Sequence, residues 1–115
     1  MSKKKAPAKR ARTERRDAAR DAVKLAEARL KLAALEAGGS PERPIEVTSA
    51  SIIEPHAAGL ACAACGASTR VEEHSAKTIM DASGSPRPLR IVHVRCTRCG
   101  VARDIYFRLG TMLAN

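Results

Sequence analysis

The four cysteines of the chain stand in two short motifs, "CAACG" at Cys62–Gly66 and "CTRCG" at Cys96–Gly100. Two residues between paired cysteines let both sulfur atoms of a tight turn face one cation. The glycine that follows lets the backbone turn with its amides directed at sulfur. Two such turns supply four thiolates, which suits one tetrahedral ion. The pattern therefore predicts one structural Zn²⁺ held by Cys62, Cys65, Cys96 and Cys99.

Such a site would be closed, because four protein ligands leave no coordination position for water or a substrate. Its role would be to stabilise the fold, with an apparent binding free energy of about 10–16 kcal/mol. The sequence needs this contribution, since Tyr106 and Phe107 are its only aromatic residues and a small domain buries little surface.

Two other uses of the cysteines fit the sequence less well. A thioredoxin-like redox pair requires a βαβ context around one Cys-x-x-Cys, whereas the predicted helix lies far before both pairs. Rubredoxin-type iron uses similar turns, but those proteins resemble acidic, aromatic-rich domains, and this chain is basic and aromatic-poor. His56, His74 and His93 are alternative ligands, yet four cysteines leave no vacancy, so we expect ordinary surface or strand residues there.

The rest of the sequence predicts the elements that position these turns. Residues 13–37 lack glycine and proline and repeat apolar residues every three or four positions, which predicts a helix capped by Thr13 and ended by Gly38-Gly39. Residues 38–44 have a linker composition, and residues 45–54 predict a strand or extended arm. Three further strands are expected at residues 70–76, 89–96 and 102–109, with a turn at residues 81–88.

Because of their two Cys-x-x-Cys-Gly motifs and the expected strands around them, residues 60–109 resemble the zinc-ribbon group found in transcription factors, RNA polymerase subunits and ribosomal proteins. The resemblance implies two cysteine turns, called knuckles, and a three-stranded antiparallel sheet. The expected fold is thus a small α+β protein. It would contain a disordered basic tail (residues 1–12), a helix (13–37), a linker (38–44) and a zinc-ribbon domain with a preceding extended segment (45–115).

The formal net charge of +9 favours an anionic partner. Residues 1–44 hold 13 Lys and Arg against 6 Asp and Glu, whereas residues 45–115 hold 8 against 6. A dense cationic arm attracts phosphates with little sequence preference. The candidate nucleic-acid contacts are Lys3, Lys4, Lys5, Lys9, Arg10, Arg12, Arg15 and Arg16, with Arg98 inside the second knuckle. A solubilising tail or a nuclear-import signal are the alternatives for this arm.

These features favour a non-enzymatic binding module on RNA or DNA in a ribosome- or polymerase-type assembly. The alternative is a protein–protein adaptor that uses the helix face and the ribbon edge. Glu72, Glu73 and His74 suggest acid–base chemistry, but no nucleophile or open metal position accompanies them, so no enzyme and no small-molecule substrate are expected. No segment reaches the roughly 18 apolar residues of a membrane helix, which favours a cytoplasmic protein without a membrane partner.

Overall fold

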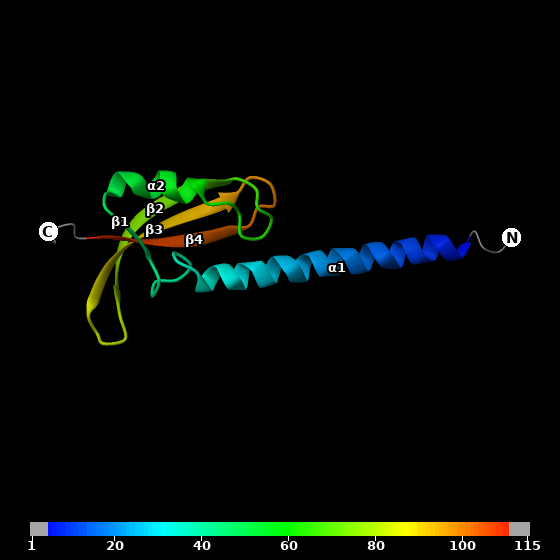
Figure 1. Cartoon of the computed structure of the whole chain (residues 1–115), viewed down its shortest axis with the longest axis horizontal. Coiled ribbons are helices and arrows are strands. Elements are labelled where there is room, and N and C mark those ends of the chain that lie inside the picture. The colour runs from blue at the N-terminus through cyan, green and yellow to red at the C-terminus, as the bar shows by residue number, and fades with distance from the viewer. Residues whose placement is uncertain (1–4, 111–115) are drawn as a thin grey trace.

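A computed structural model describes residues 5–110, with side chains from Arg10 onward. A long helix precedes a compact sheet domain (Figure 1). The elements in chain order are α1 (Lys5–Leu35), β1 (Ile45–Val47), α2 (Ala50–Gly59), β2 (Thr69–Met80), β3 (Pro86–Cys96) and β4 (Ala102–Leu109).

The sheet has four strands in the order β1-β4-β3-β2. Strands β2, β3 and β4 pair antiparallel, and all three lie close to the predicted strands. The expected three-stranded antiparallel sheet is not accurate, because β1 adds to β4 in parallel, with Ile45 opposite Phe107. The sheet is therefore mixed. The sequence contains no local signal for the pairing of β1 with β4, because some fifty residues separate the two strands and no hairpin turn joins them.

The extended segment expected at residues 45–54 is wrong beyond Val47, since α2 begins at Ala50. Ser49 caps this helix through its side-chain oxygen, which accepts a hydrogen bond from the Ser51 amide. Ile53 and Ala57, four residues apart, are fully buried against the sheet. The β-branched isoleucines favoured a strand, but burial of one helical face outweighs that preference.

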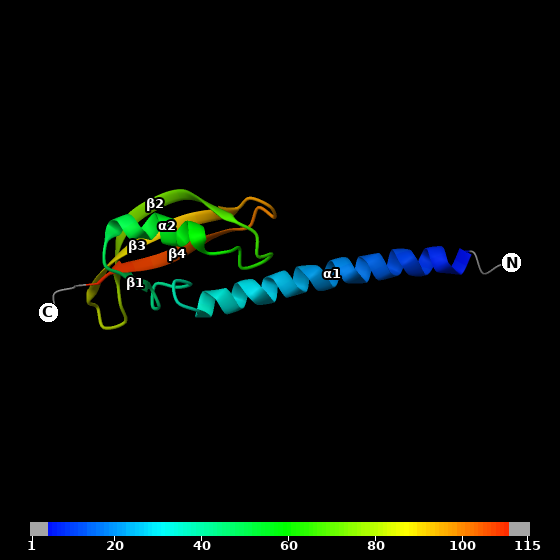
Figure 2. The ribbon, with the colours of Figure 1, turned by 45° about the horizontal axis from the view of Figure 1, so that its top comes forward.

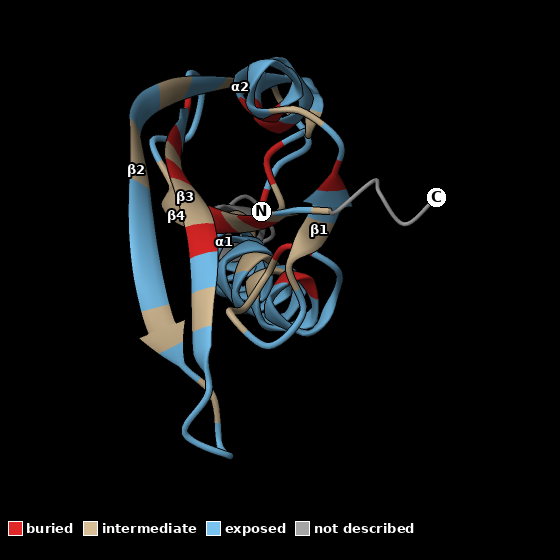
Figure 3. Ribbon diagram, turned by 90° about the vertical axis from the view of Figure 1, so that its left-hand side faces the viewer, coloured by how far each residue is buried: buried red, intermediate tan, exposed pale blue. Residues whose placement is uncertain are grey.

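Helix α2 covers one face of the sheet, and the core lies between them (Figure 3). The largest fully buried side chains there are Phe107, Ile53, Ile105, Val92 and Val94. The rings of Phe107 and His56 meet edge to face, with centroids 5.6 Å apart. One aromatic side chain thus occupies the centre of a core otherwise made of aliphatic residues.

Helix α1 is longer at its start than predicted, since residues 5–12 of the expected disordered tail belong to it. Alanine, lysine and arginine have high helix propensity, and Pro7 stands in the first turn, where proline is tolerated. Thr13 therefore lies inside the helix rather than at its cap. Residues 1–4 of the expected tail lie outside the described residues. Within residues 5–110, no helix combines the length and apolar character needed to cross a membrane.

Only the last third of α1 touches the sheet domain, and its N-terminal part projects beyond it (Figure 2). Ala26 and Leu30 pack against the cysteine-containing cluster, and Ala33 is buried. The loop that follows then joins α1 to the sheet, since the Tyr106 amide donates a hydrogen bond to the Gly38 carbonyl. The resulting molecule is elongated, with a longest extent of 80 Å.

Phe107→Ala tests whether this small core depends on its single large ring. We expect a loss of about 3–5 kcal/mol in the free energy of unfolding, because the substitution leaves a cavity that the aliphatic neighbours fill only in part. Leu32→Ala on the exposed side of α1 is the control and should change stability by less than about 0.5 kcal/mol. Urea unfolding of both variants measures the difference, and equal stabilities would contradict this description of the core.

Candidate metal centre

The structure brings the four cysteine side chains together at one end of the sheet. Their sulfur atoms all lie within 4.8 Å of one another. The shortest separations are 3.5 Å between Cys65 and Cys96 and 3.6 Å between Cys62 and Cys99. A tetrahedral ion with metal–sulfur bonds near 2.3 Å requires sulfur atoms about 3.8 Å apart. The cluster therefore fits a metal ion, and its all-cysteine donor set is consistent with a zinc-binding ribbon.

Backbone hydrogen bonds build the two knuckles in the same way. The Cys62 amide donates to the Ala67 carbonyl over 2.8 Å, and the Cys96 amide donates to the Val101 carbonyl over 2.9 Å. Gly66 and Gly100, which follow the second cysteine of each pair, have φ angles of +80° and +78°. These left-handed conformations favour glycine, so the residues expected to turn the backbone do so.

The second knuckle directs amide groups at one sulfur. The amides of Arg98 and Cys99 both donate to the sulfur of Cys96 over 3.3 Å. The Cys99 amide is the main cause that lowers the pKa of Cys96, from 9.0 to about 6. The cluster thus contains a thiol that ionises readily, as a metal ligand must.

The pKa of the Cys99 thiol changes in the opposite direction, because four thiols lie close together. The Val101 amide lowers the pKa of Cys99, but partial desolvation and the neighbouring thiols, Cys62 first, outweigh it and raise the pKa to about 12. Four thiolates at these distances repel one another, so they cannot all ionise without a cation among them. A divalent metal ion held by the four cysteines would supply that charge.

Helix α1 forms one wall of the centre. Cys62 and Cys96 are buried, whereas Cys65 and Cys99 are exposed. Ala26 and Leu30 of α1 pack against the buried pair and Ala64, and the Arg29 guanidinium donates to the Ala64 carbonyl over 3.3 Å. Ala26, Leu30 and Ala33 belong to the predicted apolar stripe, whose partner the sequence left open between the chain's own domain and another protein. The stripe indicates a buried face and does not identify its partner.

The three histidines lie away from the cysteines. The imidazole of His74 is 2.9 Å from the Glu54 carboxylate, and that of His93 is 2.7 Å from the Asp104 carboxylate. His56 contacts Phe107 in the core. Among the described residues, only the four cysteines form a group with metal-binding geometry. Glu72 and His74 also have separate partners, since Glu72 pairs with Arg95.

Asp81 stabilises the turn at the tip of the β2–β3 hairpin. Its carboxylate accepts hydrogen bonds from the Ser83 hydroxyl over 2.6 Å and from the Ser83 and Ser85 amides over 2.9 Å. The Ser83 hydroxyl is the main cause that lowers the pKa of Asp81 to about 2, with smaller contributions from the Ser85 amide and Arg87. This carboxylate is therefore fully engaged within its own turn.

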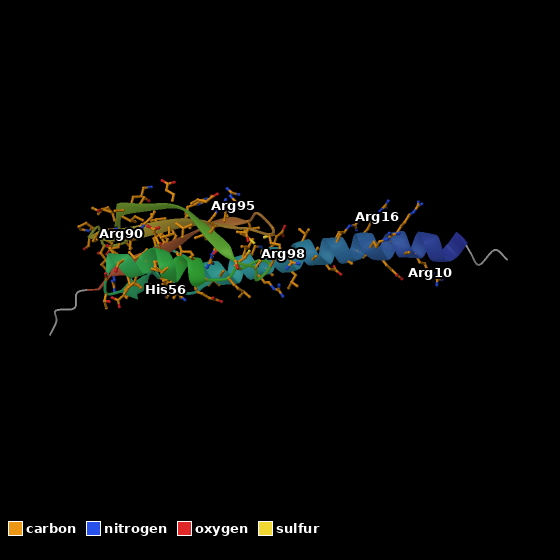
Figure 4. The ribbon with its side chains drawn as sticks, turned by 90° about the horizontal axis from the view of Figure 1, so that it is seen from above. Arg10, Arg16, His56, Arg90, Arg95 and Arg98 are labelled. Carbon is orange, nitrogen blue, oxygen red and sulfur yellow. The ribbon has the colours of Figure 1, made fainter. Side chains whose placement is uncertain are left out.

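The candidate nucleic-acid contacts lie mostly on α1. Arg10, Arg12, Arg15 and Arg16 are exposed on its projecting part, and Arg98 is exposed on the second knuckle. Figure 4 shows Arg98 at the end of the sheet domain from which α1 projects. Lys5 and Lys9 belong to α1, but their side chains lie outside the described part, as do the whole residues Lys3 and Lys4.

Comparison with models of known protein families, with curated protein sequences and with solved structures finds no match to this chain. The geometry of its own residues therefore carries the functional argument.

Cys96→Ser tests the cluster as a metal centre. We expect one metal ion per chain in the wild type and loss of that ion in the variant, because three thiolates no longer enclose a tetrahedral ion. Elemental analysis and the absorption of a Co²⁺-substituted sample measure binding and geometry. His74→Gln is the control and should keep full loading. Metal retention in Cys96→Ser together with loss in His74→Gln would contradict the four-cysteine assignment.

Proposed function

We propose that this protein is a non-enzymatic zinc-ribbon module that binds RNA or DNA through the basic face of its N-terminal helix. A ribosome- or transcription-type assembly would supply such a ligand. One observation carries the proposal: among the described side chains, the cations on the projecting part of α1 take part in no ion pair, whereas ion pairs do form within the sheet domain.

The ion pairs of the described residues all lie between Glu46 and Arg108. Within the sheet domain, Arg95 pairs with Glu72, Arg87 with Asp81 and Arg108 with Glu46. These pairs balance three of the eight Lys and Arg of residues 45–115. Arg10, Arg12 and Arg16 take part in no ion pair of the described residues and are exposed to solvent. An uncompensated cationic surface of this kind attracts polyanions by releasing their counterions.

In this proposal Zn²⁺ is structural. Cys62, Cys65, Cys96 and Cys99 would hold it, and the ion would tie the two knuckles together without contacting a substrate. Because α1 packs on the same knuckles through Leu30 and Arg29, the bound metal also fixes the direction in which the basic helix leaves the domain. The ion is thus coupled to the binding surface through packing rather than through chemistry.

Salt dependence tests the nucleic-acid proposal. Affinity for a nucleic-acid duplex should fall about 100-fold between about 50 and about 200 mM salt if four phosphates are contacted. Fluorescence anisotropy with labelled RNA and DNA duplexes measures this change. Deleting residues 1–12 should lower the affinity, because the segment carries six Lys and Arg and no Asp or Glu.

Deleting residues 111–115, which carry no charge, provides the matched control and should leave binding unchanged. Absence of binding by the full chain at low salt would contradict the proposal, whatever the behaviour of the truncated forms.

A second candidate function is a protein–protein adaptor, favoured by an apolar ridge on α1. Leu25, Leu32 and Leu35 are 51%, 60% and 64% exposed, although leucine is usually buried. Leu25 and Leu32 are seven residues apart, and Leu32 and Leu35 are three apart, so all three lie on one face of the helix. That face points away from the side of α1 that contacts the sheet domain. An apolar helix face of this type suits a helix or groove of a partner protein.

Affinity isolation from native cells after nuclease treatment separates the two functions. Proteins that remain bound to the wild type and are lost with Leu25→Asp/Leu32→Asp would favour the adaptor. Ala19→Gln, on another face of the projecting helix, is the control and should keep them. Loss of all partners on nuclease treatment would contradict the adaptor function.

A further inference from the structure

The cations of α1 are arranged along one side of the helix. Arg12, Arg16, Arg20 and Lys24 follow one another at intervals of four residues, and all four side chains are exposed. A step of four residues rises about 6 Å and turns only about 40° around the axis. The four charges therefore form one slowly winding row about 18 Å long, here called the cationic ridge.

The acidic residues of the same helical segment lie along one flank of the ridge. Glu14, Asp17 and Asp21 follow each other at intervals of three and four residues, and no ion pair of the described residues joins them to the ridge. Asp17 and Asp21 precede Arg20 and Lys24 by three residues, so the carboxylates stand beside the Lys24 end of the ridge. Figure 4 shows Arg10 and Arg16 on opposite sides of α1, so Arg10 lies off the ridge. The ridge is thus bordered by carboxylates but not interrupted by them.

The ridge works against the stability of its own helix. Like charges four residues apart cost about 0.2–0.5 kcal/mol per pair, and the ridge contains three such pairs in succession. A row of anions along the ridge would relieve this repulsion.

We infer that the cationic ridge is a docking surface for the sugar-phosphate backbone of a nucleic-acid duplex. This inference rests on the proposed function and specifies its ligand and the contacting face. A duplex carries one negative charge per about 1.7 Å of axis, so each cation along the ridge of about 18 Å can have a phosphate within reach. Binding of single strands instead relies on base stacking, and α1 contains no aromatic residue.

The sheet domain fixes the position of α1 and therefore that of the cationic ridge. Leu30 and Arg29 hold α1 against the first knuckle, so that the ridge begins close to the domain at Lys24 and runs away from it to Arg12. The exposed Arg98 lies at the same end of the domain (Figure 4). The duplex would therefore lie along α1 and extend past the domain.

Two double variants with equal charge change test the ridge. Arg16→Gln/Arg20→Gln removes two ridge cations, and Arg10→Gln/Arg15→Gln removes two cations from other faces of α1. With a labelled duplex of about 20 base pairs, we expect about a tenfold loss of affinity for the ridge variant and less than about threefold for the control. Arg16→Lys/Arg20→Lys keeps the charge and should retain binding, and far-UV circular dichroism should show the same helix content in all forms.

Three results separate failure of this inference from failure of the proposed function. Equal losses in the two glutamine variants would overturn the ridge while leaving nucleic-acid binding intact. Tighter binding of a single strand of the same length would overturn the duplex assignment. No binding of any strand by the wild type at low salt would contradict the proposed function itself. Equal affinity for RNA and DNA duplexes supports backbone recognition, and a preference for one of them identifies the source of the phosphates.

Discussion

The meeting of four cysteine sulfur atoms is the constraint on which the rest of the structure depends. Cys62 follows α2 and Cys96 ends β3, so the cluster ties together segments that lie more than thirty residues apart. The core of the sheet domain is small and contains one buried aromatic ring. A metal ion among the four sulfurs would join both knuckles, and it would also balance the charge that prevents four thiols from ionising together.

The same cluster determines where the long helix lies. Leu30 and Ala26 pack on the knuckles, and the Arg29 side chain reaches the Ala64 carbonyl. Between Arg10 and Val23 the described side chains of α1 are exposed or half-buried, and this part of the helix extends beyond the domain. The protein thus combines a domain with a candidate metal centre and a projecting helix.

Charge distribution separates the two parts further. Inside the sheet domain, carboxylates and arginines pair across strands, as Glu72 and Arg95 do. On the segment of α1 from Arg12 to Lys24, the acidic residues border the cationic ridge along one flank. This division gives the molecule one strongly positive surface rather than a uniformly basic one. A polyanion would therefore approach the helix first, and the domain would fix the direction of approach.

The sequence by itself determined the elements whose signals are local. The spacing of the cysteines and the two glycines predicted the knuckles, and the β-rich segments predicted β2, β3 and β4, because each signal lies within a few neighbouring residues. Tertiary structure decided the rest. The parallel pairing of β1, the helix α2 in place of a strand, and the docking of Leu30 on the knuckles all depend on partners distant in sequence. Burial of Ile53 and Ala57 against the sheet outweighed the strand preference of β-branched residues. Strands distant in sequence form the sheet face that buries these two residues, so no local sequence pattern could indicate it.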